Sequence, residues 1–235
     1  MVGAAHNGDC LFHGRPYTGA VNESLSNVLS FVVLTAVGLR LVQAVKLSRS
    51  SRGRSLSRVV WTRIRWRHIW PVPFVLAGVL VVAIPLMLLP VLRWGWWSAI
   101  GGDGNPIFGS NTATMGTFWS WLIPLVFMVL VVAALPLFAN AEERMFRSGA
   151  QRWSTRHRVI KVLQFGLIHA VIGIPIGVAL ALSVGGAYFM SVYLRSYALT
   201  GSPAEATLES TRAHTAYNAL IIVTVAVVVA VDAVT

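Results

Sequence analysis

Acidic residues are scarce in this chain. Only eight Asp and Glu residues occur among 235 residues, against nineteen Lys and Arg, and charged residues of both signs make up 11% of the sequence. Hydrophobic residues make up 56%, and the mean hydropathy is +0.69. Soluble domains carry about 25% charged residues, so this balance excludes an ordinary soluble fold. It predicts an integral membrane protein.

Cysteine is nearly absent as well. The single residue, Cys10, excludes an intramolecular disulfide. His6 and His13 lie close to it, but these three side chains in a loose polar segment are too few for a zinc site. Lysine is also scarce, since arginine outnumbers it seventeen to two, a bias that is common in GC-rich genomes and indicates a bacterial source.

The basic residues are concentrated in two stretches. Eight lie at positions 46–67 and six at positions 144–161, separated by apolar runs. This is the positive-inside pattern of proteins in the plasma membrane. It predicts that both stretches are loops on the cytoplasmic side, where they contact anionic lipid headgroups. The N-terminus is then expected outside. A net charge of +11 also suits nucleic acid, but tryptophans interleaved with arginines beside membrane spans favour headgroups over nucleic-acid binding.

Hydropathy and turn signals predict an all-α fold, a polytopic transmembrane helix bundle of about six spans in a single integral membrane domain, residues 1–235. After a polar N-terminal segment, 1–27, the expected spans are 28–45, 71–92, 117–141, 159–174, 177–196 and a last helix from Ala204 that contains the apolar stretch 219–231. Two glycines and a proline at 173–177 indicate a tight turn between the fourth and fifth spans. The motif-bearing core is about 117–231.

Two adjacent carboxylates follow the third apolar run. Glu142 and Glu143 lie beside the hydrocarbon core, where ionisable groups are costly and suggest a functional site. Neighbouring helix residues point about 100° apart, and Arg147 stands four residues after Glu143, the favourable order for an ion pair. That pairing leaves Glu142 as the free carboxylate and a candidate general base. A salt-bridge cluster that caps a membrane helix is the alternative, and the acid pair taken alone favours it.

Three further polar residues are expected at a compatible depth. His169 lies about 12 Å along a helix from Lys161, and His214 and Asn218 are four residues apart, so they share a helix face. Together with Glu142, they all fall in the cytoplasmic half of the membrane. An acid, two histidines and an amide at one depth form a candidate catalytic site.

Each of these residues also has a structural explanation. A membrane histidine is more often a hydrogen-bond donor in helix packing than a catalyst, and His214 with Asn218 would serve to join two helices. Phe165 is expected to pack in the core. His68 and His157, in the basic stretches, are expected to be solvated.

Three motifs in this order resemble a known family. The residues are Glu142-Glu143-x-x-x-Arg147, Phe165-Gly-Leu-Ile-His169 and His214-Thr-Ala-Tyr-Asn218. They are similar to the EExxxR, FxxxH and HxxxN motifs of the CPBP (Abi) intramembrane proteases, relatives of the type II CAAX prenyl endopeptidase. The resemblance covers about residues 141–220. Arg144 and Ser148 depart from the family pattern, which usually has an apolar residue and often a glycine at these positions.

The resemblance implies a membrane-embedded endopeptidase that forms no covalent enzyme intermediate and acts on a membrane-associated peptide or protein. Glu142 would be the general base, His169 would help to bind and activate the water, and His214 and Asn218 would stabilise the oxyanion. The supporting residues would be Glu143, Arg147 and Phe165.

Other mechanisms and functions remain open. Glu142, His169 and His214 would also suit a zinc ion with one open position, so metal-free and metal-dependent hydrolysis are both compatible with the sequence. A non-catalytic membrane scaffold or bacteriocin-immunity-type protein that retains the motifs is the first alternative function. A small-solute carrier is a more distant one, suggested by ionisable groups within the membrane.

Overall fold

The computed structural model describes residues 23–95 and 119–232, and every regular element in these ranges is helical. The all-α prediction is therefore confirmed for the described part of the chain. The α-helices are α1 (Glu23–Arg49), α2 (Ser51–Thr62), α3 (Trp66–Ile69), α4 (Val72–Leu88), α6 (Trp119–Phe146), α7 (Thr155–Leu167), α8 (Ile176–Ala181), α9 (Ser183–Thr200) and α10 (Pro203–Asp232). The 3₁₀ helices are η1 (Pro90–Arg93), η3 (Ala150–Arg152) and η4 (Ile168–Ile172). Cys10, its neighbouring histidines and most of the predicted polar segment lie outside the described residues.

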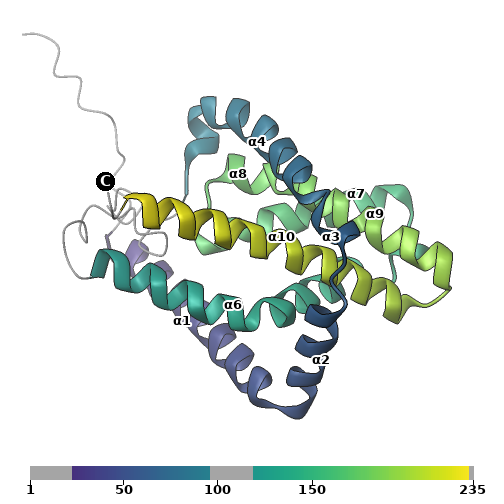
Figure 1. Ribbon diagram of the computed structural model, residues 1–235. Coiled ribbons are helices and arrows are strands. Elements are labelled where there is room, and N and C mark those ends of the chain that lie inside the picture. The colour runs from purple at the N-terminus through teal and green to yellow at the C-terminus, as the bar shows by residue number, and fades with distance from the viewer. Residues whose placement is uncertain (1–22, 96–118, 233–235) are drawn as a thin grey trace, which may run out of the picture.

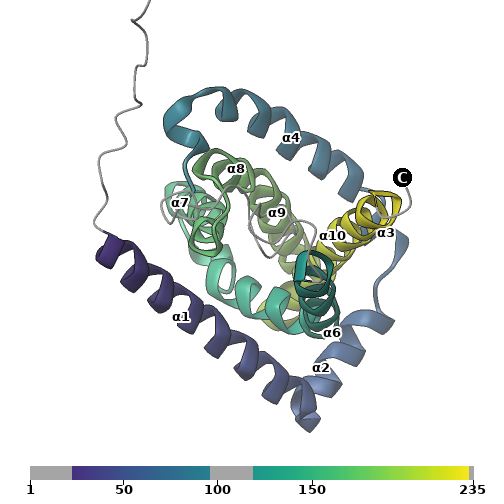
Figure 2. The same cartoon turned by 90° about the vertical axis from the view of Figure 1, so that its left-hand side faces the viewer.

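Helices α6, α7, α9 and α10 form the core of the bundle. Helix α6 runs antiparallel to α10 at its side, and α9 packs against both α10 and α7 (Figure 1). Helices α1 and α4 lie on opposite sides of this core, α1 against α6 and α4 against α8 and α9 (Figure 2). One buried aromatic ring from each core helix fills the centre, and these rings are Phe146, Phe165, Phe189 and Tyr217. The three motif-bearing helices therefore meet around one aromatic cluster.

Helix α4 presents an apolar face to its surroundings. Phe74, Val81 and Ile84 are each between 63% and 71% exposed. Removing such surface from water is favourable by about 25 cal/mol per Å², so this face suits hydrocarbon better than solvent. Two helical segments, Trp66–Leu88 and Ile176–Thr200, are long and apolar enough to cross a membrane. Both observations indicate membrane association.

Two left-handed glycines end the helices that lead into the site. Gly149 has φ of 93°, and the amides of Arg147 and Ser148 donate to the Glu143 carbonyl at 2.9 and 3.2 Å, so α6 stops directly after its acid pair. Gly173, with φ of 91°, closes the turn that the sequence predicts at 173–177 and that leads into α8. This turn is confirmed.

The two basic stretches are helical, which corrects the expectation of loops. The first contains α2 and α3, and the second contains η3 and the start of α7. In α2, Val60 is fully buried while Arg52, Arg54 and Arg58 are exposed. An amphipathic helix of this kind has a polar average hydropathy because its arginines outweigh its narrow apolar side. Average hydropathy along the sequence therefore does not predict this helix.

Candidate active site

A buried ion pair closes the last turn of α6. Arg147 Nη1 donates to Glu143 Oε1 at 2.6 Å, and both side chains are at most 1% exposed, which confirms the predicted i,i+4 pair. Arg147 Nη2 also donates to the Gly186 carbonyl at 3.4 Å, and the guanidinium lies 4.2 Å from the centre of the Phe165 ring. Desolvation of two charges is costly, so the carbonyl and the cation–π contact help to hold the pair inside the bundle.

Helix α10 brings two more partners to Glu143. His214 Nδ1 lies 2.9 Å from Glu143 Oε1, and the Ser210 hydroxyl contacts Glu143 Oε2 and, at 3.0 Å, the carbonyl of Phe189. A carboxylate only accepts hydrogen bonds, so Nδ1 of His214 carries a proton and donates it. Glu143 thereby fixes one side of the His214 imidazole and leaves Nε2 for another partner.

Aromatic rings fix the plane of the His214 imidazole. It stacks on Phe189, with centroids 4.3 Å apart and an interplanar angle of 21°, and meets Phe165 edge to face at 5.5 Å. The side chain is only 2% exposed. His214 Nε2 is consequently held at one point in the bundle, 3.7 Å from Oε2 of Glu142.

Glu142 is the free carboxylate that the sequence predicts. Its side chain is 31% exposed, yet Oε2 is buried and has no hydrogen-bond partner among the described residues. A separation of 3.7 Å from His214 Nε2 is too long for a direct hydrogen bond, but one water molecule can bond to both atoms. Buried polar atoms are nearly always paired, so this oxygen is a candidate binding point for water or substrate.

Two predicted site residues lie nearby without direct contact to the acids. His169 is in η4, where its Nδ1 is 2.8 Å from the Phe165 carbonyl, so its Nε2 is left as an acceptor. The Phe165 ring contacts both imidazoles, with centroids 5.2 Å from His169 and 5.5 Å from His214. Asn218 is half-buried, one turn beyond His214. Neither His169 nor Asn218 hydrogen-bonds to Glu142 or His214 within the described ranges.

The described residues do not gather a metal site. Across residues 23–95 and 119–232, no three His, Cys, Asp or Glu side chains are arranged to hold a metal ion. Of the set considered for zinc, Glu142 faces His214 at 3.7 Å, whereas the hydrogen bond of His169 runs to the Phe165 carbonyl. Zinc binding by Glu142, His169 and His214 therefore stays a prediction.

Ser210 and Phe189 belong to the site although the sequence analysis did not single them out. Ser210 precedes His214 by four residues on α10, so helical periodicity predicts that the two side chains share a helix face. Phe189 carries no local signal, because its contact with His214 depends on how α9 packs against α10. Phe165 is 3% exposed and lies in the core, so its predicted packing role is confirmed.

A second polar cluster joins α3 to the start of α10. His68 is 2% exposed, which corrects the expectation that it is solvated. Its Nδ1 accepts from the amide of Arg65 at 2.9 Å, and its Nε2 donates to Glu209 Oε1 at 2.8 Å. Arg67 and Arg212 also pair with Glu209, at 2.7 and 2.8 Å. One carboxylate on α10 thus anchors the segment that precedes α4.

The Glu209 cluster predicts a pH dependence of stability. Burial opposes ionisation, but hydrogen bonds from His68 and Arg212 and the charge of Arg67 outweigh it and lower the pKa of Glu209 from 4.5 to about 2. The ionised carboxylate therefore stabilises the fold fully above about pH 4.5, and this contribution is lost as the pH falls toward 2. We expect a loss on the order of 1 kcal/mol after solvent screening.

Thermal midpoints in detergent, from about pH 5.5 to about pH 2.5, measure this effect. The wild-type midpoint should fall further than that of Glu209→Gln, which has no proton to gain at this position. Parallel curves for the two proteins would contradict the assignment to Glu209.

Residues of all three motif-bearing helices thus surround one aromatic cluster, with Glu142 Oε2 and His214 Nε2 facing each other at 3.7 Å. No family model, curated protein or solved structure matches the chain. What the chain does has therefore to be inferred from its own residues.

Proposed function

We propose that the chain is an intramembrane endopeptidase, which hydrolyses a peptide bond of a membrane-associated peptide or protein with water activated by Glu142. The observation that carries the proposal is the unpaired Oε2 of Glu142, which faces His214 Nε2 at 3.7 Å while Glu143 holds the other side of that ring. A carboxylate and an imidazole that bond to the same water can polarise it for attack. The order of the three motifs supports the same reaction.

In the proposed reaction Glu142 takes a proton from the water while the water oxygen attacks the carbonyl carbon. The negative oxygen of the tetrahedral intermediate accepts hydrogen bonds from Asn218 and from Nε2 of a protonated His214, whose positive charge Glu143 stabilises. The C–N bond then breaks, and Glu142 returns the proton to the leaving nitrogen. His169 Nε2 helps to orient the water. No bond forms between enzyme and substrate.

The proposed membrane arrangement has about six spans in a bacterial plasma membrane. The outward apolar face of α4 contacts lipid, and the arginines of α2 and of the start of α7 lie at the cytoplasmic surface near anionic headgroups. The N-terminus is then outside, and the acid pair at the end of α6 reaches the cytoplasmic half of the bilayer. A substrate would approach from that side.

Cleavage of a set of membrane peptides by the purified protein in detergent tests the proposal. We expect wild type to release products and His169→Ala to be about 10- to 100-fold slower, since the water would lose one of the groups that orient it. Gln164→Ala, which removes an exposed polar side chain from the preceding helix, α7, should match wild type. A chelator should leave the rate unchanged if the water is metal-free and abolish it if a metal holds the water.

Equal rates for His169→Ala and Gln164→Ala would contradict the role of His169. The proposal that the chain is an enzyme would be contradicted if the wild-type protein cleaved none of the peptides while cells that express it kept their phenotype.

A non-catalytic scaffold or immunity-type protein is the second candidate. It is favoured by the absence of any hydrogen bond from His169 or Asn218 to the acid pair within the described ranges, together with the closed network around Glu143. Such a network holds three helices together whether or not catalysis occurs. Under this alternative, Glu142→Ala leaves the cellular activity intact.

A further inference from the structure

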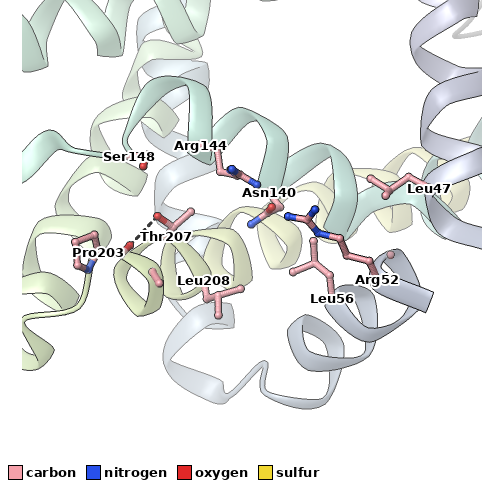
Figure 3. Close-up of a pocket in the computed structure, with 11 residues that line it drawn as sticks. Leu47, Arg52, Leu56, Asn140, Arg144, Ser148, Pro203, Thr207 and Leu208 are labelled. Atoms are coloured by element: carbon pink, nitrogen blue, oxygen red, sulfur yellow. Dashed lines mark hydrogen bonds between the residues drawn. The ribbon is translucent and has the colours of Figure 1, made fainter. Parts of the chain in front are cut away.

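A cavity of about 670 Å³ lies where the corner between α1 and α2 meets the end of α6 and the start of α10 (Figure 3). It is lined by none of the residues that we assign to hydrolysis. Most of its wall is apolar, and Leu47, Leu56 and Leu208 contribute to it from three different helices. The cavity is open on one side, so that a ligand can enter from the surroundings.

Two arginines line this cavity without an acidic partner. Arg52 of α2 and Arg144 of α6 are both exposed, and Figure 3 shows their guanidinium groups pointing toward Asn140 between them. Neither forms an ion pair with any described residue. The Asn140 amide nitrogen donates to Thr211 at 3.2 Å, which fixes it against α10. Two converging guanidinium groups favour an anion between them, and their planar donors match a phosphate group.

The chain builds this corner tightly. A Cβ atom on Gly53 would come within 1.9 Å of the Leu47 carbonyl oxygen, so only glycine allows α2 to pack this closely against the end of α1. The Ser50 hydroxyl accepts from the Gly53 amide at 3.0 Å and caps α2. Arg52 and Leu56, which follow on the first turns of α2, are thereby held at the cavity.

The far end of α2 and helix α3, which follow the cavity residues of α2 along the chain, resemble a membrane interface. Trp61 and Trp66 are 40% and 73% exposed and lie among exposed arginines at the end of α2 and in α3. Tryptophan and arginine together are typical of the headgroup level of a bilayer. In the cavity, the leucines provide an apolar wall for a lipid acyl chain, and the two arginines provide positive charge for a lipid headgroup.

We propose that this cavity binds one anionic membrane phospholipid, with its phosphate between Arg52 and Arg144 and part of an acyl chain along Leu47, Leu56 and Leu208. The lipid joins α2 to α6 and α10 at the cytoplasmic end of the bundle. The proposal requires no catalytic activity of the neighbouring site, so it stands or falls independently of the proposed protease.

Titration of the purified full chain with phosphatidylglycerol, followed by native mass spectrometry, tests the proposal. We expect wild type to retain one phosphatidylglycerol, with an affinity at least about tenfold higher than for phosphatidylcholine. Arg52→Gln with Arg144→Gln should lower that affinity at least about tenfold. Arg58→Gln with Arg63→Gln, which removes the same charge from exposed positions that do not line the cavity, should change it less than about twofold.

A third variant, Ala204→Trp, fills the cavity without any change of charge. It should reduce phosphatidylglycerol retention as strongly as the double arginine variant does. Thermal unfolding of each variant in detergent checks that its midpoint equals that of wild type. Equal losses in the two arginine pairs would assign binding to general surface charge and overturn the proposal. Displacement of the lipid by millimolar inorganic phosphate, or retention of a co-purified peptide in its place, would overturn it as well.

Discussion

The variant Glu142→Gln is expected to hydrolyse membrane peptides about 10²- to 10⁴-fold more slowly than wild type while it folds as wild type does. The amide of Gln keeps the size and shape of the side chain but cannot take a proton from water. The Glu142 side chain is partly exposed, and its buried oxygen has no hydrogen-bond partner among the described residues. Its removal should therefore alter the free energy of unfolding by no more than about 0.5 kcal/mol. Initial cleavage rates and thermal midpoints measure the two effects.

The matched control for this variant is Glu205→Gln. It makes the same chemical change in the first turn of α10, where the carboxylate is 38% exposed and pairs with Arg212 at 2.7 Å. Its cleavage rate should remain within about twofold of wild type, because a partly exposed ion pair contributes little. Glu142→Gln activity at the wild-type rate would exclude Glu142 as the general base.

The variant Arg147→Met is expected to lower the free energy of unfolding by about 3–5 kcal/mol, which corresponds to about 10 °C in the thermal midpoint of a chain of this size. Methionine fills a similar length between Phe165 and Phe189 but leaves the fully buried Glu143 carboxylate without its cation. An unpaired buried charge is far more destabilising than the absence of the pair. Thermal unfolding in detergent, followed by circular dichroism, measures the loss.

Two comparisons decide whether this loss reflects the buried charge. The double variant Glu143→Gln with Arg147→Met removes both charges and should recover part of the stability, because no uncompensated charge remains. Arg67→Met breaks the ion pair between Arg67, whose side chain is 59% exposed, and Glu209. It should lower the free energy of unfolding by less than about 1 kcal/mol. If Arg147→Met were no more destabilising than Arg67→Met, the buried pair would not be the element that holds α6 in place.

Local rules predicted the parts of the site that lie within one helix. The i,i+4 spacing identified the pair of Glu143 and Arg147 and so left Glu142 free, as the structure has it. Glycine and proline at 173–177 identified the turn before α8. Both are short-range features, in which sequence separation alone determines which atoms can meet.

Contacts between distant segments could not be predicted in the same way. The hydrogen bond of His214 to Glu143 joins residues 71 positions apart, and it gives Glu143 a second role, as the support of the imidazole. His68 lies among arginines in the sequence, yet it is buried because Glu209, 141 positions later, packs over it. Average hydropathy reports neighbours along the chain, whereas burial depends on neighbours in space.

The order of these contacts along the chain has a consequence for biogenesis. Ser210 and His214 reach back to Glu143 from α10, which follows every other helix of the site in the sequence. While the ribosome is still synthesising the intervening residues, Arg147 is the only one of these side-chain partners of Glu143 that the nascent chain contains. The position proposed for the water does not exist until α10 has been inserted and has docked against α6. The site proposed for hydrolysis is therefore complete only after synthesis has passed residue 214.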